Sequence, residues 1–156
     1  IRYSRDNART PMQWSHEKEA GFTTGKPWLK VNPNYTEINV EDQLKDEDSV
    51  LHFYKKLIAL RKSEAYRETL IFGRFVPAFE ADEDVFAFYR ESESGDRIFI
   101  AANFGKEEKT LTLPEKRYTV LLTNDDSAPE GTLSTLENDG TLCLKSCGAI
   151  VLREEA

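Results

Sequence analysis

The sequence predicts a mainly β protein in which an antiparallel β-sandwich follows a long loop and a helical segment. From about Leu70 onward, short runs of alternating apolar and polar residues are separated by turn-forming residues every ~8–12 residues, the pattern of sandwiches and barrels. Residues 39–63 instead repeat apolar side chains at three- and four-residue spacing, which is the period of a helix. Residues 1–38 follow neither period.

The composition is that of a globular protein. Of 156 residues, 39% are hydrophobic and 31% charged, and this length corresponds to about one domain, or a small domain with part of another. Acidic residues outnumber basic ones by 28 to 21, which argues against a nucleic-acid partner because a phosphate backbone requires a basic face. No run approaches the ~20 apolar residues of a membrane span, so no membrane partner is expected. The first residue is Ile1 rather than Met, so a fragment of a longer protein is one expectation.

Residues 1–38 are expected to form one long, ordered loop. The prolines restrict the residues before them to extended conformations and remove backbone donors, which interrupts helices and strands. The aromatic side chains argue against disorder, since such residues gain most from packing. A loop of this length in a compact domain usually has a function, and we expect one here. The prolines are Pro11, Pro27 and Pro33, and the aromatic residues include Trp14, Phe22, Trp28 and Tyr35.

Two helices are expected between residues 39 and 63. Asn39 can cap a short helix, with Asp42 three residues further on. A longer helix begins at Asp48 or Ser49 after acidic residues and ends near Lys62 with basic ones, as the helix dipole favours. The apolar stripe of this helix is wider than one neighbouring element would cover. The stripe consists of Val50, Phe53, Tyr54, Leu57, Ile58 and Leu60.

Eight strands are expected after the helices. The segments between them are rich in Gly, Asn, Asp and Ser, which favour tight turns, so the strands should pair antiparallel. The predicted strands are residues 73–79, 85–91, 97–104, 108–113, 118–123, 132–136, 142–145 and 149–153.

Residue spacing alone indicates no catalytic centre. The sequence has no Gly-rich phosphate loop, no Gly-x-Ser-x-Gly turn and no cluster of His and Cys, so neither a metal nor another cofactor is expected. His52 lies on the longer helix, where packing or capping is a commoner role than general base, and His16 lies in the long loop. Cys143 and Cys147 are expected to be reduced thiols of a cytoplasmic protein, because a disulfide across three residues is awkward within one strand.

Several segments of the chain carry a resemblance to one known family. They are Ser4-Arg5-Asp6-Asn7-Ala8-Arg9-Thr10-Pro11-Met12-Gln13-Trp14, Ala20-Gly21-Phe22-Thr23, Pro27-Trp28-Leu29-Lys30-Val31-Asn32-Pro33-Asn34-Tyr35, the helix from Asp48 to Lys62, and Ala101-Ala102-Asn103-Phe104. Together they resemble the C-terminal part of the α-glucosidases of glycoside hydrolase family thirteen, which include oligo-1,6-glucosidase, dextran glucosidase and trehalose-6-phosphate hydrolase. The resemblance extends nearly from end to end. One departure is Ser15, where the family commonly has Asp, and it puts one local loop contact in doubt.

The resemblance implies an architecture. Family members have a (β/α)₈ barrel followed by an antiparallel β-sandwich, and barrel active sites are built from the loops after the strands. Residues 1–64 would then be the last active-site loop and last helix of an incomplete catalytic barrel. Residues 65–156 would be the C-terminal β-sandwich.

The resemblance also implies an activity for the parent enzyme. Retaining hydrolysis of α-1,6-linked or related gluco-oligosaccharides requires two carboxyl groups ~5–5.5 Å apart. In the family these groups lie on earlier barrel strands, so no catalytic residue is expected in this chain and the chain alone should be inactive. The expected partners are the α-gluco-oligosaccharide and the missing N-terminal barrel. Without the barrel, we expect the chain to self-associate.

Arg5 and Asp6 are the residues to which the resemblance assigns substrate contact. Arg5 resembles the arginine that binds the non-reducing glucose, and a planar guanidinium can donate to sugar hydroxyls and to a carboxylate at once. Asp6 could accept hydroxyl donors near the same pocket. Arg9, Thr10 and Pro11 are expected to hold the loop in shape. For Trp14 and Trp28, loop packing is the favoured role and sugar stacking the alternative.

Two alternatives remain open from the sequence. A stand-alone carbohydrate-binding or accessory β-sandwich would have no reason to carry a barrel's last loop and helix. A sucrose-isomerising enzyme is close kin to the hydrolases, and Met12 favours the hydrolases because isomerases often have Phe there. The sequence leaves the choice among isomalto-oligosaccharides, dextran ends and trehalose 6-phosphate undecided, because the selecting residues would lie in the barrel.

Overall fold

The structure is a computed structural model that describes residues 5–125, 133–135 and 140–155. The chain divides into two compact units, Ile1–Lys55 and Lys56–Ala156, and the division falls within a helix.

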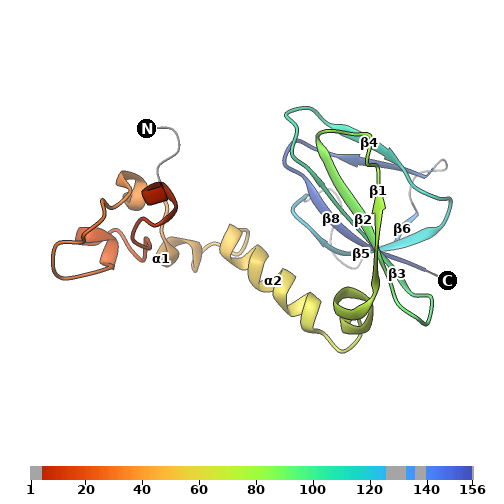
Figure 1. Ribbon diagram of the computed structural model, residues 1–156, viewed down its shortest axis with the longest axis horizontal. Helices are drawn as coiled ribbons and strands as arrows, with labels where there is room; N and C mark the ends of the chain where they lie inside the picture. The colour runs from red at the N-terminus through yellow and green to blue at the C-terminus, as the bar shows by residue number, and fades with distance from the viewer. Residues whose placement is uncertain (1–4, 126–132, 136–139, 156) are drawn as a thin grey trace. The chain divides into compact units, whose positions relative to one another are not determined.

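The first unit consists of short helical turns joined by loop (Figure 1). Two backbone hydrogen bonds tie its middle to its end, from the nitrogens of Val40 and Glu41 to the carbonyl oxygens of Gln13 and Trp14. The prediction of a long loop therefore holds for residues 9–32 apart from one turn, and the loop is fixed by its own backbone. The helical turns are the 3₁₀ turns η1 (Arg5–Ala8), η2 (Lys18–Gly21) and η3 (Pro33–Thr36), followed by the helix α1 (Val40–Gln43).

The loop bends sharply at η2. Glu19, Ala20 and Gly21 all have positive φ, which is rare for residues with a Cβ. Ala20 is completely buried, and its carbonyl oxygen accepts hydrogen bonds from the backbone nitrogens of Trp14 and Ser15 at 2.9 and 3.1 Å. Burial and these two bonds offset the cost of the unfavourable backbone conformation.

Asn39 caps α1 as the sequence predicts. Its side-chain oxygen accepts a hydrogen bond from the backbone nitrogen of Asp42 at 3.0 Å. The same side chain donates to the carbonyl oxygen of Tyr35 at 3.0 Å, so the cap also closes η3 against α1. This polar residue is almost fully buried, which its complete hydrogen bonding permits.

The longer predicted helix is α2 (Val50–Lys62). At its start Ser49 donates to the carbonyl oxygen of Gln43 at 2.7 Å, and the ring nitrogen Nδ1 of His52 lies 2.7 Å from the carbonyl oxygen of Asp46. His52 thus has the capping type of role predicted for it. No α2 residue is buried, and the apolar stripe includes exposed side chains at Val50, Tyr54, Leu57 and Ile58.

A short π-helix, η4 (Glu68–Phe72), joins α2 to the sheet. The sequence pattern predicts that alternation begins at about Leu70, and that start is wrong by a few residues. Thr69 and Leu70 are both buried, so consecutive side chains lie inward as they do on a helical turn. Two arginines donate to its backbone carbonyl oxygens: Arg61 to that of Leu70 at 2.9 Å and Arg90 to that of Ile71 at 3.0 Å.

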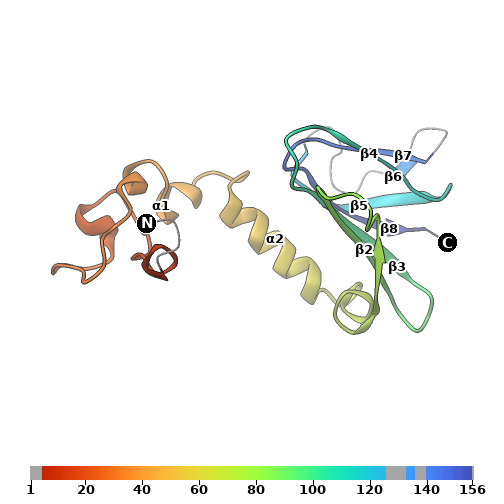
Figure 2. The same ribbon diagram turned by 45° about the horizontal axis from the view of Figure 1, so that its top comes forward.

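The second unit is an antiparallel β-sandwich, and all eight predicted strands are present. A six-stranded sheet has the order β1-β2-β3-β8-β5-β6, and a two-stranded sheet consists of β4 and β7. Figure 2 shows β4 and β7 as a second layer beside the larger sheet. Residues 132 and 136, the predicted limits of the sixth strand, lie outside the described residues. The strands are β1 (Arg74–Ala78), β2 (Val85–Glu91), β3 (Arg97–Asn103), β4 (Lys109–Thr112), β5 (Arg117–Thr123), β6 (Leu133–Thr135), β7 (Thr141–Leu144) and β8 (Ala149–Glu154).

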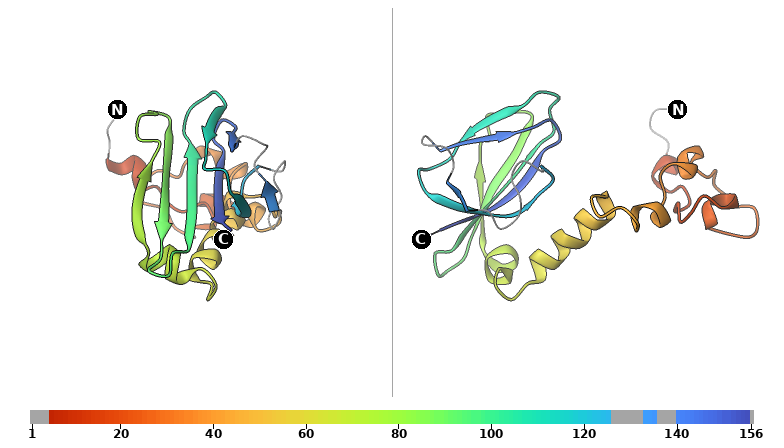
Figure 3. Two further views of the ribbon diagram at one scale, coloured as in Figure 1. Left: turned by 90° about the vertical axis from the view of Figure 1, so that its right-hand side faces the viewer. Right: turned by 180° about the vertical axis from the view of Figure 1, so that it is seen from behind.

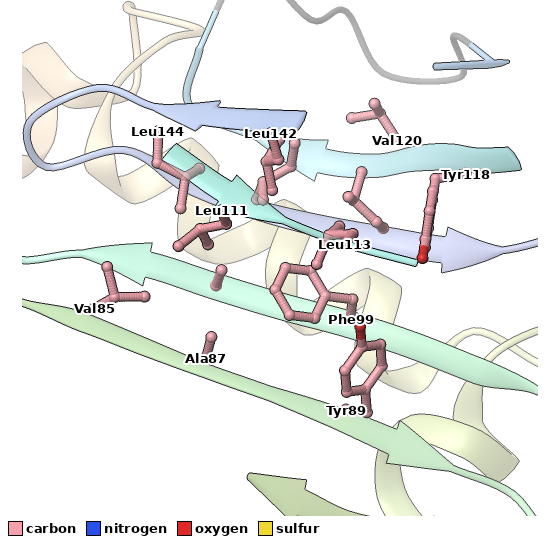
Figure 4. Close-up of a cluster of buried hydrophobic side chains, with 13 residues drawn as sticks. Val85, Ala87, Tyr89, Phe99, Leu111, Leu113, Tyr118, Val120, Leu142 and Leu144 are labelled. Atoms are coloured by element: carbon pink, nitrogen blue, oxygen red, sulfur yellow. The ribbon is translucent and has the colours of Figure 1, made fainter. Parts of the chain in front are cut away.

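The core lies between these two sheets (Figure 4). Phe99 on β3 is completely buried, with the ring of Tyr89 on β2 at 4.9 Å between centroids. Leu111 and Leu144, which belong to β4 and β7, close the core from the second sheet. The alternation of buried and exposed residues along β2 and β5 follows from this single inner face.

Among the described residues, no helix is long and apolar enough to cross a membrane. The predicted thiols Cys143 and Cys147 are both free and exposed.

Candidate functional site

The long loop of the first unit encloses a hollow of about 530 Å³. Its wall mixes polar and apolar side chains and includes one carboxylate, one indole ring and one ammonium group. Such a mixture suits a ligand that has both apolar faces and hydroxyl groups. The lining residues are Asp6, Thr10, Trp28, Leu29, Lys30, Val31, Asn32 and Pro33.

Arg9 contacts two groups of the hollow's wall, the carboxylate of Asp6 and the indole ring of Trp28. Its guanidinium lies 2.5 Å from Oδ1 of Asp6 and 5.3 Å from the centre of the Trp28 ring. An arginine over an indole face gains a cation–π attraction, so one side chain fixes both the carboxylate and the ring. The role predicted for Arg9, holding the loop in shape, agrees with these contacts. The ion pair is largely exposed and adds little stability by itself.

Trp28 is 80% exposed, although loop packing is the role that its sequence favours. Only Arg9 makes an aromatic-face contact with it among the described residues. Pro27 restricts Lys26 before it and Pro33 restricts Asn32, and between the two prolines the backbone bends at Trp28 and Leu29. The ring is therefore presented at the hollow rather than packed beneath it, and this geometry favours the alternative role, stacking on a flat ligand ring.

Arg5 lies on η1 beside Asp6 but does not line the hollow. Its side chain is exposed and forms no hydrogen bond or ion pair within the described part of the chain. The structure thus brings Asp6 and Trp28 together and leaves the Arg5 guanidinium open. The substrate contacts predicted for Arg5 and Asp6 remain predictions. Lys30 and Asn32 also line the hollow; the sequence analysis contained them in the family motif between Pro27 and Pro33 but assigned them no role.

His16 belongs to the α1 end of the loop. Its Nδ1 lies 3.4 Å from Oδ2 of Asp42 and its Nε2 lies 3.9 Å from Oε2 of Glu41. The hydrogen bond from Asn39, then that from Lys45 and the charge of His16, lower the pKa of Asp42. His16 does not line the hollow. Within the described residues no three His, Cys, Asp or Glu side chains are grouped so as to hold a metal ion.

Two family models match successive parts of the chain. Residues 2–69 match the model described as alpha amylase, catalytic domain. Residues 85–145 match the model described as alpha-amylase SusG C-terminal domain. The chain belongs to the α-amylase family of glycoside hydrolases. The resemblance stated from the loop motifs is confirmed, and the catalytic-domain match contains both Arg5 and Asp6.

Individual members of the α-amylase family agree with this assignment. An oligo-1,6-glucosidase of Bacillus cereus is 46% identical over 111 residues, which cover 71% of this chain and 19% of that protein. The structure of trehalose-6-phosphate hydrolase from Bacillus licheniformis matches with a TM-score of 0.83 at 34% identity, covering 98% of this chain and 27% of that one. Isomaltulose synthase from Klebsiella sp. LX3 matches with a TM-score of 0.84 at 35% identity, covering 97% and 26%.

The chain therefore spans about a fifth to a quarter of the length of these α-amylase family relatives. The mainly antiparallel fold and the family assignment agree with the predictions made from sequence. The predicted domain limits, residues 1–64 and 65–156, remain predictions.

Proposed function

We propose that the chain acts as the C-terminal part of an α-glucosidase that hydrolyses α-1,6-linked or related α-linked gluco-oligosaccharides with retention of configuration. In this proposal residues 1–64 supply a substrate-binding loop and the last helix of the catalytic barrel. Residues 65–156 supply a structural β-domain. The catalytic carboxylates come from the preceding part of the barrel.

The observation that carries the proposal is the match of residues 2–69 to an α-amylase catalytic domain. A carbohydrate-binding module that acts alone would not require such a segment. The names of the relatives support the substrate class, since oligo-1,6-glucosidases of Bacillus cereus and Bacillus subtilis are 46% and 50% identical over 111 and 112 residues.

The loop geometry supports the roles of its residues. Arg5 offers several fixed donors, and with no partner among the described residues it is available to sugar hydroxyls and to a carboxylate of the barrel. Asp6, held by Arg9, accepts hydroxyl donors. Trp28 presents a flat apolar face to a pyranose ring.

A chimera tests the proposal. The chain replaces the matching segment of the Bacillus cereus oligo-1,6-glucosidase, and hydrolysis of isomaltose and of p-nitrophenyl α-glucoside is measured. We expect the chimera to be active and the isolated 156-residue chain to be inactive. A folded chimera without activity, or turnover by the repurified chain alone, contradicts the proposal.

Arg5→Ala in the same chimera tests the substrate-binding loop. We expect kcat/KM to fall by at least ~10²-fold, because a buried carboxylate and a sugar hydroxyl lose their charged donor. Arg5→Lys should restore little, since an ammonium group cannot reproduce the planar fork. Lys26→Ala, an exposed cation of the same loop that does not line the hollow, is the matched control and should keep full activity. Nearly full activity of Arg5→Ala would refute the assignment.

The choice between hydrolase and isomerase is made with the complete parent enzyme of this chain, because the selecting residues would lie in its own barrel. Product analysis after incubation with sucrose should show glucose release rather than a rearranged disaccharide if Met12 marks a hydrolase. Isomaltulose or trehalulose as the main product would favour a sucrose-isomerising enzyme. The isomaltulose synthase of Klebsiella sp. LX3 is one of the structural neighbours of this chain.

A further inference from the structure

The β-sandwich unit has a hollow of its own, separate in sequence from that of the long loop. It has a volume of about 810 Å³ and lies where η4 meets the start of β1 and the β2–β3 turn. Figure 3 shows η4 beneath this end of the sheet. The lining residues are Glu68, Phe72, Gly73, Arg74, Glu91, Ser92, Glu93 and Ser94.

The backbone around Gly73 builds one wall of this hollow. A Cβ at Gly73 would lie 2.3 Å from the carbonyl oxygen of Thr69 and 2.8 Å from that of Glu91, so only glycine permits η4 to approach β2 this closely. Because Thr69 is buried and Phe72 is 65% exposed, the turn is anchored on its inner side and presents the Phe72 ring on the outer side. π-Helical turns often occur at functional sites.

Paired charged groups lie beside this wall, on Arg74 and Glu91. Arg74 Nη2 lies 2.5 Å from Glu91 Oε2, and Arg97 Nε lies 2.8 Å from Glu91 Oε1. The hydrogen bond from Arg74, together with the charge of Arg97, lowers the pKa of the Glu91 carboxyl, so it is ionised at neutral pH. Glu68 and Glu93 form no ion pair within the described residues.

The β2–β3 turn forms the remaining rim and is ordered by its own hydrogen bonds. The hydroxyl oxygens of Ser92 and Ser94 lie 2.8 Å apart. Ser94 donates to Asp96 Oδ2 at 2.9 Å, and Ser92 accepts from the backbone nitrogen of Asp96 at 3.0 Å. The rim therefore offers hydroxyl groups at positions set before any ligand binds, which reduces the ordering that binding would require.

The chemistry of this hollow matches a sugar better than an ion. Three carboxylates against one lining arginine disfavour an anion, and no metal-binding group exists among the described residues. A pyranose has one apolar face for the Phe72 ring and hydroxyls that donate to Glu68 and Glu93 and accept from Arg74. We propose that this hollow is a second carbohydrate-binding site, for α-linked gluco-oligosaccharides, on the β-domain. It goes beyond the proposed function and takes from it only the choice of sugar.

Calorimetric titration of the 156-residue chain with isomaltotriose and with maltotriose tests the site. We expect the wild-type chain to bind at least one of them with a Kd in the ~0.1–10 mM range, and Phe72→Ala to weaken that binding at least tenfold. Phe72→Trp should retain or improve it, because the indole keeps the apolar face. Phe104→Ala is the matched control, since Phe104 is 75% exposed and does not line the hollow.

The long-loop hollow must be distinguished in the same titration. In a Trp28→Ala background, binding that still depends on Phe72 supports the proposal. No binding of either sugar up to ~20 mM, or equal effects of Phe72→Ala and Phe104→Ala, would overturn it. Activity of the chimera tests only the proposed function, so failure of one proposal is distinguishable from failure of the other.

Discussion

The side-chain nitrogen of Asn103, at the end of β3, donates a buried hydrogen bond to the carbonyl oxygen of Leu144, at the end of β7, at 3.0 Å. The same nitrogen lies 2.8 Å from the carbonyl oxygen of Glu107 and 3.0 Å from that of Lys145. Its partner atom Oδ1 accepts from the backbone nitrogen of Gly105 at 2.8 Å. One amide therefore joins the end of β3 to the turn after β7 and links the two sheets.

Asn103→Asp should destabilise the β-sandwich by about 2–3 kcal/mol, because a carboxylate has no proton to donate to three carbonyl oxygens. The variant keeps the shape of the side chain, so packing changes little. Urea unfolding followed by far-UV circular dichroism measures the loss. Thr112→Ala, at an exposed position of β4, should change stability by less than about 0.5 kcal/mol. Equal stability of Asn103→Asp and the wild type would contradict this role.

Gly140→Ala should cost more than Gly95→Ala, although both glycines have positive φ. A Cβ at Gly140 would lie 2.3 Å from the carbonyl oxygen of Leu113, whereas nothing lies within 4 Å of one at Gly95. We expect about 1 kcal/mol for Gly95→Ala from the backbone conformation alone and more than about 3 kcal/mol for Gly140→Ala. Thermal unfolding of the two variants side by side checks this. Similar losses would show that the backbone near Leu113 can move aside.

The strands were predictable from sequence because each has one inner face, and alternation of buried and exposed residues is a local signal. The pairing was not, since β8 lies between β3 and β5 and no period within a strand specifies a distant partner. η4 was missed because Leu70, Ile71 and Phe72 form an apolar run that a strand or a helical turn could equally contain.

For the candidate site, the loop motif alone points to Arg5 and Asp6. The hollow itself depends on features that spacing does not reveal. Asp6 lies only three residues before Arg9, but Trp28 comes within reach of the Arg9 guanidinium because the loop folds back on itself. The left-handed conformation of Ala20, whose carbonyl oxygen accepts from the nitrogens of Trp14 and Ser15, is likewise not apparent from an alanine in the sequence.

Asn39→Ala should loosen the first unit. The change removes the cap on the Asp42 nitrogen and the bond to the Tyr35 carbonyl oxygen, at a cost of about 1–2 kcal/mol. Amide hydrogen exchange in residues 39–44 should accelerate about tenfold, since ~1.4 kcal/mol corresponds to a factor of ten. Asn32 is the matched control because it precedes η3 without a side-chain cap. If Asn32→Ala accelerates exchange as much, capping is not the cause.

Tyr118 should make the β-sandwich sensitive to alkaline pH. Burial, followed by the charges of Tyr89 and Glu154, raises the pKa of Tyr118 to about 12. In the unfolded chain the same phenol ionises near pH 10. The contribution of the neutral Tyr118 side chain to the free energy of unfolding is therefore complete below pH 10 and is lost as the pH rises towards 12. Absorbance at about 295 nm, where tyrosinate absorbs, should show one tyrosine that ionises last, and Tyr118→Phe should remove that step. Tyr54→Phe, at a 58% exposed position, should not. A wild-type titration with no late step would contradict the assignment.

The isolated chain should self-associate through the stripe on α2. Val50, Tyr54, Leu57 and Ile58 are spaced to share one helical face and are all exposed. Light scattering should show a mass that rises with concentration, and Ile58→Lys should suppress the rise. Ala59→Lys introduces the same charge at the next position, off the stripe, and should have little effect. A monomer at every concentration would show that the stripe needs no partner.

The position of β8 has a consequence for how the protein is made. During synthesis β1, β2 and β3 emerge first and can pair as a meander, but β3 and β5 each keep a row of unpaired backbone groups until β8 arrives between them. Ribosome stalling or a stop codon before residue 149 would remove β8 from the middle of the sheet and would leave two open edges, one on β3 and one on β5. Open sheet edges recruit other chains. Truncated products should therefore be cleared or aggregate rather than accumulate in soluble form, and chaperone demand should be greatest in the interval between the synthesis of β3 and that of β8.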